Sequence, residues 1–165
     1  TRSRFYSDDQ RGRTRSYYRV SGGKIFIMRV LVDTNVILDY VLARQPFHSD
    51  AEKIILGVAK KDFVGYFSSI TPINVYYTGR KLKGKQPTIK ALRRLLNLFE
   101  VCAADKSVLQ TAFASNFNDY EDAVQHESAV AENLDAIVTR NIKDFKNASI
   151  QVYSPDEFLQ ILQIT

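Results

Sequence analysis

Acidic side chains stand at the ends of apolar segments in three separated parts of this sequence. Asp33 ends the apolar run 25–32, and Asp144 follows a second, shorter apolar run. Asp119 and Asp122 open an amphipathic stretch between them. In a parallel α/β sheet, ligands bind beyond the carboxyl ends of the strands, so a carboxylate there faces a cleft. Because Mg²⁺ prefers oxygen ligands and keeps several waters, these acids indicate a metal-dependent phosphotransfer or nuclease site.

Each acidic residue also has a structural interpretation that the sequence leaves open. Asp33 has the position of a cap for the helix that follows it. Asp119 and Asp122 have the three-residue spacing of a capping box, in which Asp119 accepts backbone N–H bonds. Asp144 has the position of a cap for a short turn, and Glu121, about 100° around the helix from Asp122, is expected to be solvated.

The sequence lacks the residues that several other catalytic sites require. A phosphatase of the haloacid-dehalogenase type needs a second Asp where this chain has Asn35. The sequence has no Gly-rich phosphate loop. With His48 and His126 as the only histidines, no Ser–His–Asp arrangement is readable, and His126 is expected to be structural.

The elements that must position the acids alternate from residue 24 onward. Apolar segments predict strands, and amphipathic segments that open on Ser, Thr, Asp or Pro predict helices. The predicted strands cover 25–32, 64–68, 99–102, 136–138 and 150–153. The predicted helices cover 35–42, a segment from 49, a segment from Thr71 (N-cap) and Pro72, a segment from Thr88 (N-cap) to 98, 105–114, 119–132 and a segment from 154. This alternation is typical of a mainly parallel sheet covered on both faces, an α/β fold.

Length and composition set the broad class. The 165 residues are enough for one domain with a sizeable core. No apolar stretch is long enough to span a membrane, and the first residues lack the segments of a signal peptide. Cys102 is the only cysteine, so an intrachain disulfide is impossible. We therefore expect a cytoplasmic protein.

The net charge of +5 belongs to the N-terminal part of the chain. Residues 1–27 carry seven of the 23 basic and two of the 18 acidic side chains, which leaves 16 of each in residues 28–165. We treat residues 1–23, rich in Arg, Tyr and Ser, as a tail before a domain of residues 24–165. Either Met28 is the natural start and the tail is upstream sequence, or the tail is a basic arm that binds RNA or a partner.

Four segments, in this order along the chain, resemble PIN-domain proteins. They are VDTNVILD (32–39), SSIT (68–71) leading to Tyr76 and Tyr77, DYEDAVQ (119–125) and IVTRNIKDF (137–145). The resemblance extends over about residues 28–162 and implies a three-layer α/β/α sandwich. Many such proteins are VapC-type toxins, so it also implies a ribonuclease that uses Mg²⁺ or Mn²⁺, an antitoxin partner and a homodimer.

The resemblance assigns site residues by position. It implies Asp33, Asp122 and Asp144 as metal ligands and catalytic residues, Asp119 as a further ligand, and Asn35, Thr139 and Asn141 in support. The family's second acid falls on Asn74, which is a candidate catalytic residue, and Asn141 stands where many members have Asp. Asn keeps an oxygen ligand but loses a charge. These two departures motivate an alternative, a non-catalytic PIN module that binds RNA or a protein.

A run of basic residues without an acid adds a candidate RNA contact. Its first members are Arg80, Lys81, Lys83 and Lys85. Such a run is usually a solvated helical face, and it is also suited to track an RNA backbone without reading sequence.

Overall fold

The alternation of strands and helices predicted from residue 24 onward is present. The computed structural model describes residues 3–8, 14–20 and 23–164, with side chains from residue 27 to residue 162. Its strands are β1 (Ser3–Asp8), β2 (Thr14–Val20), β3 (Gly23–Ile27), β4 (Arg29–Val32), β5 (Val64–Ser68), β6 (Glu100–Cys102), β7 (Ala136–Val138) and β8 (Gln151–Tyr153). Its helices are α1 (Thr34–Val41), α2 (His48–Lys60), α3 (Thr71–Leu82), α4 (Lys85–Leu98), α5 (Lys106–Ala114), α6 (Tyr120–Ala131), the short 3₁₀ helix η1 (Ile142–Phe145) and α7 (Pro155–Ile164).

Five strands form one sheet in the order β6-β5-β4-β7-β8. Every neighbouring pair is parallel, and in the central strand β4 Leu31 lies opposite Tyr66 on one side and Ile137 on the other. The prediction of a mainly parallel sheet is therefore confirmed. Because all five strands run the same way, their carboxyl ends meet at one edge, where ligands bind in such sheets.

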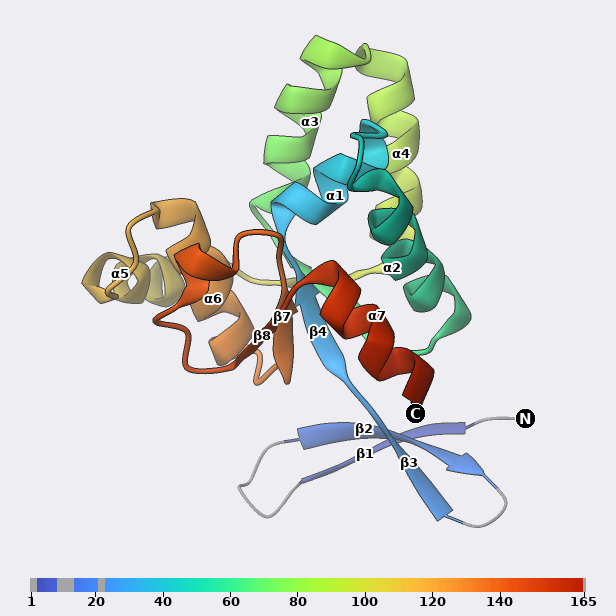
Figure 1. Cartoon of the computed structure of the whole chain (residues 1–165). Helices are drawn as coiled ribbons and strands as arrows, with labels where there is room; N and C mark the ends of the chain where they lie inside the picture. The colour runs from blue at the N-terminus through green and yellow to red at the C-terminus, as the bar shows by residue number, and fades with distance from the viewer. Residues whose placement is uncertain (1–2, 9–13, 21–22, 165) are drawn as a thin grey trace.

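The core has two sides, as the alternation of side chains along a strand requires. Val30 and Val32 of β4 pack with residues of α1, α2 and α7, whereas Leu31 faces the opposite side and packs with Ala129 of α6. Figure 1 shows α5 and α6 on one side of the sheet and α2 and α7 on the other. The three-layer α/β/α sandwich is thus confirmed.

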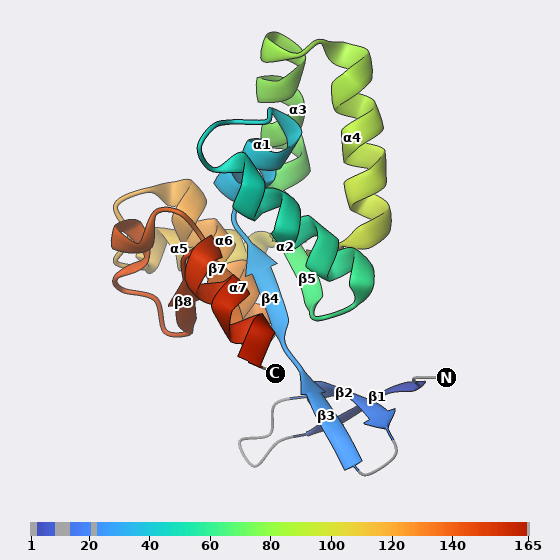
Figure 2. The same cartoon turned by 45° about the vertical axis from the view of Figure 1, so that its right-hand side comes forward.

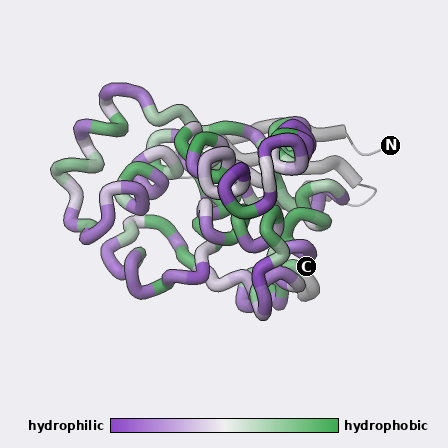
Figure 3. Tube along the Cα trace, turned by 90° about the horizontal axis from the view of Figure 1, so that it is seen from above, coloured by the Kyte–Doolittle hydropathy of each residue, from purple (hydrophilic) through white to green (hydrophobic). Residues whose placement is uncertain are grey.

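The helices are amphipathic covers for this sheet. In Figure 3, hydrophobic and hydrophilic segments alternate along the helical turns, as expected where one helical face is buried. Helices α3 and α4 form a hairpin that stands out from the sheet in both Figure 1 and Figure 2. A Cβ at Gly79 of α3 would lie 2.7 Å from Cγ2 of Thr88 in α4, so the two helices touch closely here. Among the described residues, no helix is long and apolar enough to cross a membrane.

The structure corrects three details of the sequence prediction. The expected strand 25–32 is interrupted at Met28, and its halves belong to different sheets. Thr71 is the first helical residue of α3, with Ile70 in the N-cap position. The helix assigned to begin at Thr88 begins three residues earlier, after Gly84, whose φ of 95° ends the previous turn. The Thr88 hydroxyl donates back to the Gly84 carbonyl at 2.7 Å, so it closes a turn inside the helix.

The N-terminal segment forms its own antiparallel sheet in the order β1-β2-β3. Residue Tyr17 of β2 pairs with Phe5 of β1 and with Phe26 of β3. In Figures 1 and 2 this sheet lies beyond the amino end of β4, at the opposite end of the molecule from the α3–α4 hairpin. Residues 1–2, 9–13 and 21–22 and all side chains before residue 27 lie outside the described residues. The boundary at residue 24 and the binding arm therefore stay predictions.

Candidate metal-binding cleft

Asp33 lies at the carboxyl end of the central strand, where β4 passes into α1. Its backbone N–H donates to the Val138 carbonyl at 3.0 Å, which extends the pairing of β4 with β7 by one residue. Its side chain is 1% exposed and caps α1 by accepting from the Asn35 backbone N–H at 3.4 Å. Asp33 therefore caps α1 and also lines the cleft described below.

Two further side chains hold the Asp33 carboxylate in place. Oδ1 accepts from the Gln125 side-chain amide at 2.9 Å, and Oδ2 accepts from the Thr139 hydroxyl at 2.7 Å. Gln125 also accepts from the Thr34 backbone N–H at 3.1 Å. Burial raises the pKa of Asp33, while the hydrogen bonds from Thr139 and Gln125 lower it. The carboxylate is therefore fixed in orientation before any ligand binds.

The start of α6 brings two more carboxylates to the same place. Asp119 is the N-cap and accepts from the backbone N–H groups of Glu121 and Asp122, at 2.8 and 3.2 Å. The predicted capping role of Asp119 is confirmed. Asp122 is only 8% exposed. Burial, followed by the negative charges of Asp33, Asp119, Asp144 and Glu121, raises the pKa of Asp122 to about 7.

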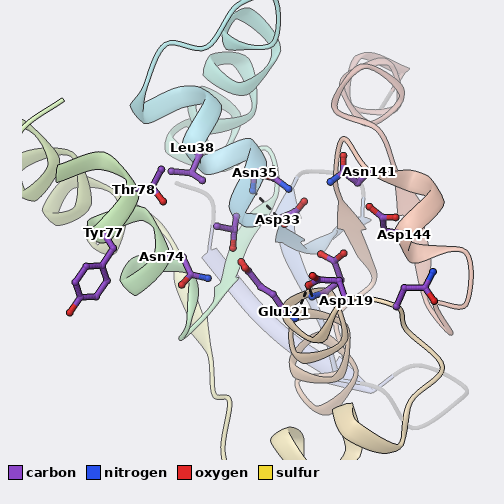
Figure 4. Close-up of a pocket in the computed structure, with 13 residues that line it drawn as sticks. Asp33, Asn35, Leu38, Asn74, Tyr77, Thr78, Asp119, Glu121, Asn141 and Asp144 are labelled. Carbon is purple, nitrogen blue, oxygen red and sulfur yellow. Dashed lines mark hydrogen bonds between the residues drawn. The ribbon is translucent and has the colours of Figure 1, made fainter. Parts of the chain in front are cut away.

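These acids surround a cleft of about 560 Å³ at the carboxyl edge of the sheet (Figure 4). Acids and amides dominate its lining, which consists of Asp33, Thr34, Asn35, Leu38, Asn74, Tyr77, Thr78, Asn118, Asp119, Glu121, Asp122, Asn141 and Asp144. In Figure 4, Asn141 and Asp144 lie on one side of Asp33, and Asn74, Tyr77 and Thr78 of α3 lie on the other. The cleft thus has an acidic centre and one wall made by α3.

Most predicted site residues converge here. Asp144 is exposed at the cleft, and Asn74 and Asn141 line opposite sides of it. Thr139 is fully buried beneath the cleft, where its hydroxyl donates to Asp33 and accepts from the Asn141 backbone N–H at 3.0 Å. Thr139 therefore contacts the site through Asp33.

Sequence reasoning missed or misplaced several contributors. Glu121, expected to be solvated, is half-buried and lines the cleft, because the cleft wraps around the first turn of α6. The sequence pattern does not mark Gln125 as a site residue, although it stands three residues after Asp122 and therefore on a neighbouring part of the same helical face. Thr71, which the sequence predicts only as a helix cap, has its hydroxyl 3.0 Å from that of Thr34. His126 is structural, as expected: its Nε2 accepts from the Ser149 backbone N–H at 3.0 Å.

The predicted RNA-contacting cations lie outside the cleft lining. Arg80, Lys81, Lys83 and Lys85 are all exposed around the turn of the α3–α4 hairpin. The Lys83 ammonium donates to the Val41 carbonyl at 2.8 Å, so this side chain ties the hairpin to α1. Arg80 lies over the ring of Tyr76, with 5.8 Å between its guanidinium carbon and the ring centre.

The donor set of the cleft fits a hydrated hard cation. Its candidate ligands are carboxylate and amide oxygens, and a buried Asp122 beside Asp33 concentrates negative charge that a cation would neutralise. Within the described part of the chain, no group of three or more His, Cys, Asp or Glu side chains is arranged to hold an ion alone. Mg²⁺ typically binds through one or two carboxylates, waters and substrate phosphates. An open cleft with a few carboxylates therefore suits Mg²⁺ better than a closed cage of protein ligands would.

Comparison with known proteins agrees with this fold. A family model described as PIN domain matches residues 29–143, a range that includes Asp33, Asp119 and Asp122 and ends one residue before Asp144. The chain therefore belongs to the PIN-domain family. None of the curated proteins is a significant match.

Solved structures with a similar fold include VapBC proteins and a toxin–antitoxin complex. The DNA-bound VapBC of Salmonella typhimurium is similar with a TM-score of 0.60 at 19% identity, covering 78% of this chain and 99% of that one. A toxin–antitoxin complex from Klebsiella pneumoniae gives 0.58 at 24% identity, with 76% and 97% covered. VapC20 of Mycobacterium tuberculosis, a Sarcin–Ricin loop cleaving toxin, gives 0.54 at 15% identity, with 66% and 86% covered.

Proposed function

We propose that this chain is a metal-dependent endoribonuclease of the PIN type and the toxin of a toxin–antitoxin pair. One observation carries the proposal: Asp122 is buried beside Asp33 in an acidic cleft, and its pKa is raised to about 7. Crowded carboxylates of this kind are costly to the fold and cluster at functional sites. Membership of the PIN-domain family and similarity to VapBC proteins and VapC20 support the nuclease and toxin parts.

In this proposal the residues of the cleft hold the ion and orient the RNA. Asp33 and Asp122 hold Mg²⁺ or Mn²⁺, with Asp119 and Asp144 in support. The bound ion supplies Lewis-acid stabilisation for the charge that develops on the phosphate. Asn74 faces the acids from α3, where its amide is placed to hydrogen-bond a phosphate oxygen.

The second candidate is a non-catalytic module that binds RNA or a protein. It is favoured by Asn74 and Asn141, because both line the cleft with an uncharged amide where the family resemblance leads one to expect a carboxylate. Asp119 and Glu121 add two negative charges to the same cleft, which offsets this loss in the catalytic reading.

Metal titration separates the two functions. We would add Mg²⁺ or Mn²⁺ to the wild type and to Asp122→Asn, and follow both thermal stability and cleavage of a structured RNA pool. Metal-dependent cleavage and stabilisation that are lost in Asp122→Asn support the nuclease. Glu100→Gln is the control, since Glu100 is exposed on β6 outside the cleft and its substitution also replaces one carboxylate with an amide. RNA binding without cleavage supports the non-catalytic module if neither the metal nor the Asp122→Asn substitution changes it.

The proposal includes two protein partners. The solved VapBC structures and the Klebsiella complex motivate an antitoxin partner for this chain. The homodimer follows from the family resemblance and stays a prediction, which light scattering of the purified chain tests.

A further inference from the structure

The α3 wall of the cleft carries an aromatic side chain that the proposed metal chemistry does not use. Tyr77 lines the cleft and yet is 63% exposed. In Figure 4 its ring lies at the outer end of the cleft and points away from the acids. Single exposed aromatic rings are common on protein surfaces, so it is the position of Tyr77 beside a polar cleft that makes it a candidate contact: a partner stacked on the ring would remove a large apolar surface from water.

Tyr77 is also held in place from one side. Its ring meets that of Tyr76 edge to face, with centres 5.4 Å apart and planes at 76°. Tyr76 in turn lies under Arg80. An edge-to-face contact covers at most one face of the Tyr77 ring, so at least one face stays available to a flat partner.

The chemistry along α3 changes in steps from the cleft outward. Asn74 faces the acidic centre, Tyr77 follows three residues later, and Lys81 follows four residues after that, so the three share one helical face. No acidic residue occurs from residue 63 to residue 99, whereas the same segment holds seven basic ones. This wall therefore offers an amide, an aromatic platform and then positive charge, which matches a nucleic-acid strand better than an apolar protein segment.

We infer that Tyr77 stacks on an unpaired base of the RNA, next to the phosphate held at the acidic centre, and so selects single-stranded substrate. This inference rests on the proposed nuclease function. An aromatic ring stacks on bases only where they are splayed out of a helix, because a paired base in a duplex already has neighbours on both faces. Stacking tolerates any base, so Tyr77 favours unpaired RNA without fixing its sequence.

The kinetic test removes the ring and the base in turn. We expect Tyr77→Ala to lower kcat/KM for a single-stranded RNA on the order of tenfold, mainly through KM, and Tyr77→Phe to stay near the wild type. The same RNA with abasic nucleotides beside the cleaved bond should be cut equally by the wild type and by Tyr77→Ala. Phe113→Ala is the control, because Phe113 is 75% exposed on α5 outside the cleft lining. Equal losses for both RNAs would overturn the inference.

A binding test works even if the chain does not cleave RNA. The sequence has no tryptophan, so Tyr77→Trp places a single reporter at the platform. We expect oligoadenylate to quench its fluorescence, and an abasic oligomer of the same length to leave it unchanged. Quenching without cleavage would support the stacking site and contradict the proposed nuclease function. Cleavage that is the same in the wild type and in Tyr77→Ala would support the nuclease function and contradict the stacking site.

Discussion

At the scale of single residues, the crowded carboxylates of the cleft set how the protein responds to pH. Burial and the charge of Asp33 raise the pKa of Asp122 from its usual 3.8 to about 7. Between these values the folded protein keeps a proton that the unfolded chain has released. Unfolding then releases protons, so the free energy of unfolding falls as the pH rises from 3.8 to about 7 and levels off above.

We therefore predict that the protein in EDTA loses stability over this pH range. The loss from Asp122 is at most about 4 kcal/mol, because each pKa unit corresponds to 1.36 kcal/mol. Asp122→Asn should remove this part of the pH dependence and stabilise the metal-free protein near neutral pH. Urea unfolding at a series of pH values measures both effects. Burial also raises the pKa of Asp33 and of Asp39, so some slope should remain. A slope identical in wild type and variant would contradict the prediction.

The sequence could predict the acids of the site but not their orienting partner. Asp33 was predictable because an apolar strand that ends in Asp places its carboxylate at the binding edge of a parallel sheet. Gln125 was not, since its importance arises only when α6 packs against the end of β4 and its amide meets Asp33 and the Thr34 backbone. A glutamine inside a helix gives no such signal, and only its spacing from Asp122 suggests the shared face.

At the scale of elements, apolar patterns predicted the sheet and its helical cover well, and capping residues predicted boundaries less well. Strands 64–68 and 136–138 match the structure residue for residue. Thr88 failed as a cap because Gly84, with its positive φ, had already turned the chain into α4. A threonine four residues into a helix is then free to bond its hydroxyl back to a preceding carbonyl, which local sequence alone does not distinguish from a cap.

An ion pair fixes the loop after β7 to the first helix. Arg140 Nε lies 2.9 Å from Oδ2 of Asp39, a residue of α1 that is 1% exposed. The guanidinium carbon also lies 4.0 Å from the centre of the Phe47 ring. Thr139 and Asn141 flank Arg140 in the chain, and they respectively bond Asp33 and line the cleft. The pair therefore positions one side of the site from outside it.

We predict that Arg140→Met destabilises the protein by about 3 kcal/mol, because it leaves a buried carboxylate with little compensation. Arg44 stays 3.9 Å from Asp39, which keeps the loss at the lower end of the usual range. Asp39→Asn combined with Arg140→Met should restore much of the stability, since neither charge then remains. Urea unfolding of the two single variants and the double variant forms the test. Additive losses in the double variant would show that the two residues do not interact.

At the scale of the whole molecule, folding places acidic and basic side chains in different regions. Residues 28–165 carry equal numbers of acidic and basic side chains. In the structure the cleft gathers five acids, while the α3–α4 hairpin, residues 71–98, carries seven basic residues and no acid. The sequence shows the acid-free run, but only the fold places it beside an acidic cleft. Such a pattern lets a polyanion lie along the hairpin while one phosphate reaches the acidic centre.

The last prediction concerns the salt dependence of RNA binding, because each phosphate that a cation neutralises releases counterions. For single strands, the slope of log affinity against log salt changes by about 0.7 for each such contact. Arg80→Gln combined with Lys81→Gln should therefore weaken binding of oligoadenylate and reduce the slope by about 1.4 if both residues contact phosphates. Lys60→Gln with Lys61→Gln is the matched control, since these exposed lysines lie at the end of α2, outside the hairpin. Fluorescence anisotropy at several salt concentrations measures the slopes. Equal slopes for the two double variants would mean that the hairpin is a solvated surface, and that the strand follows another path from Tyr77.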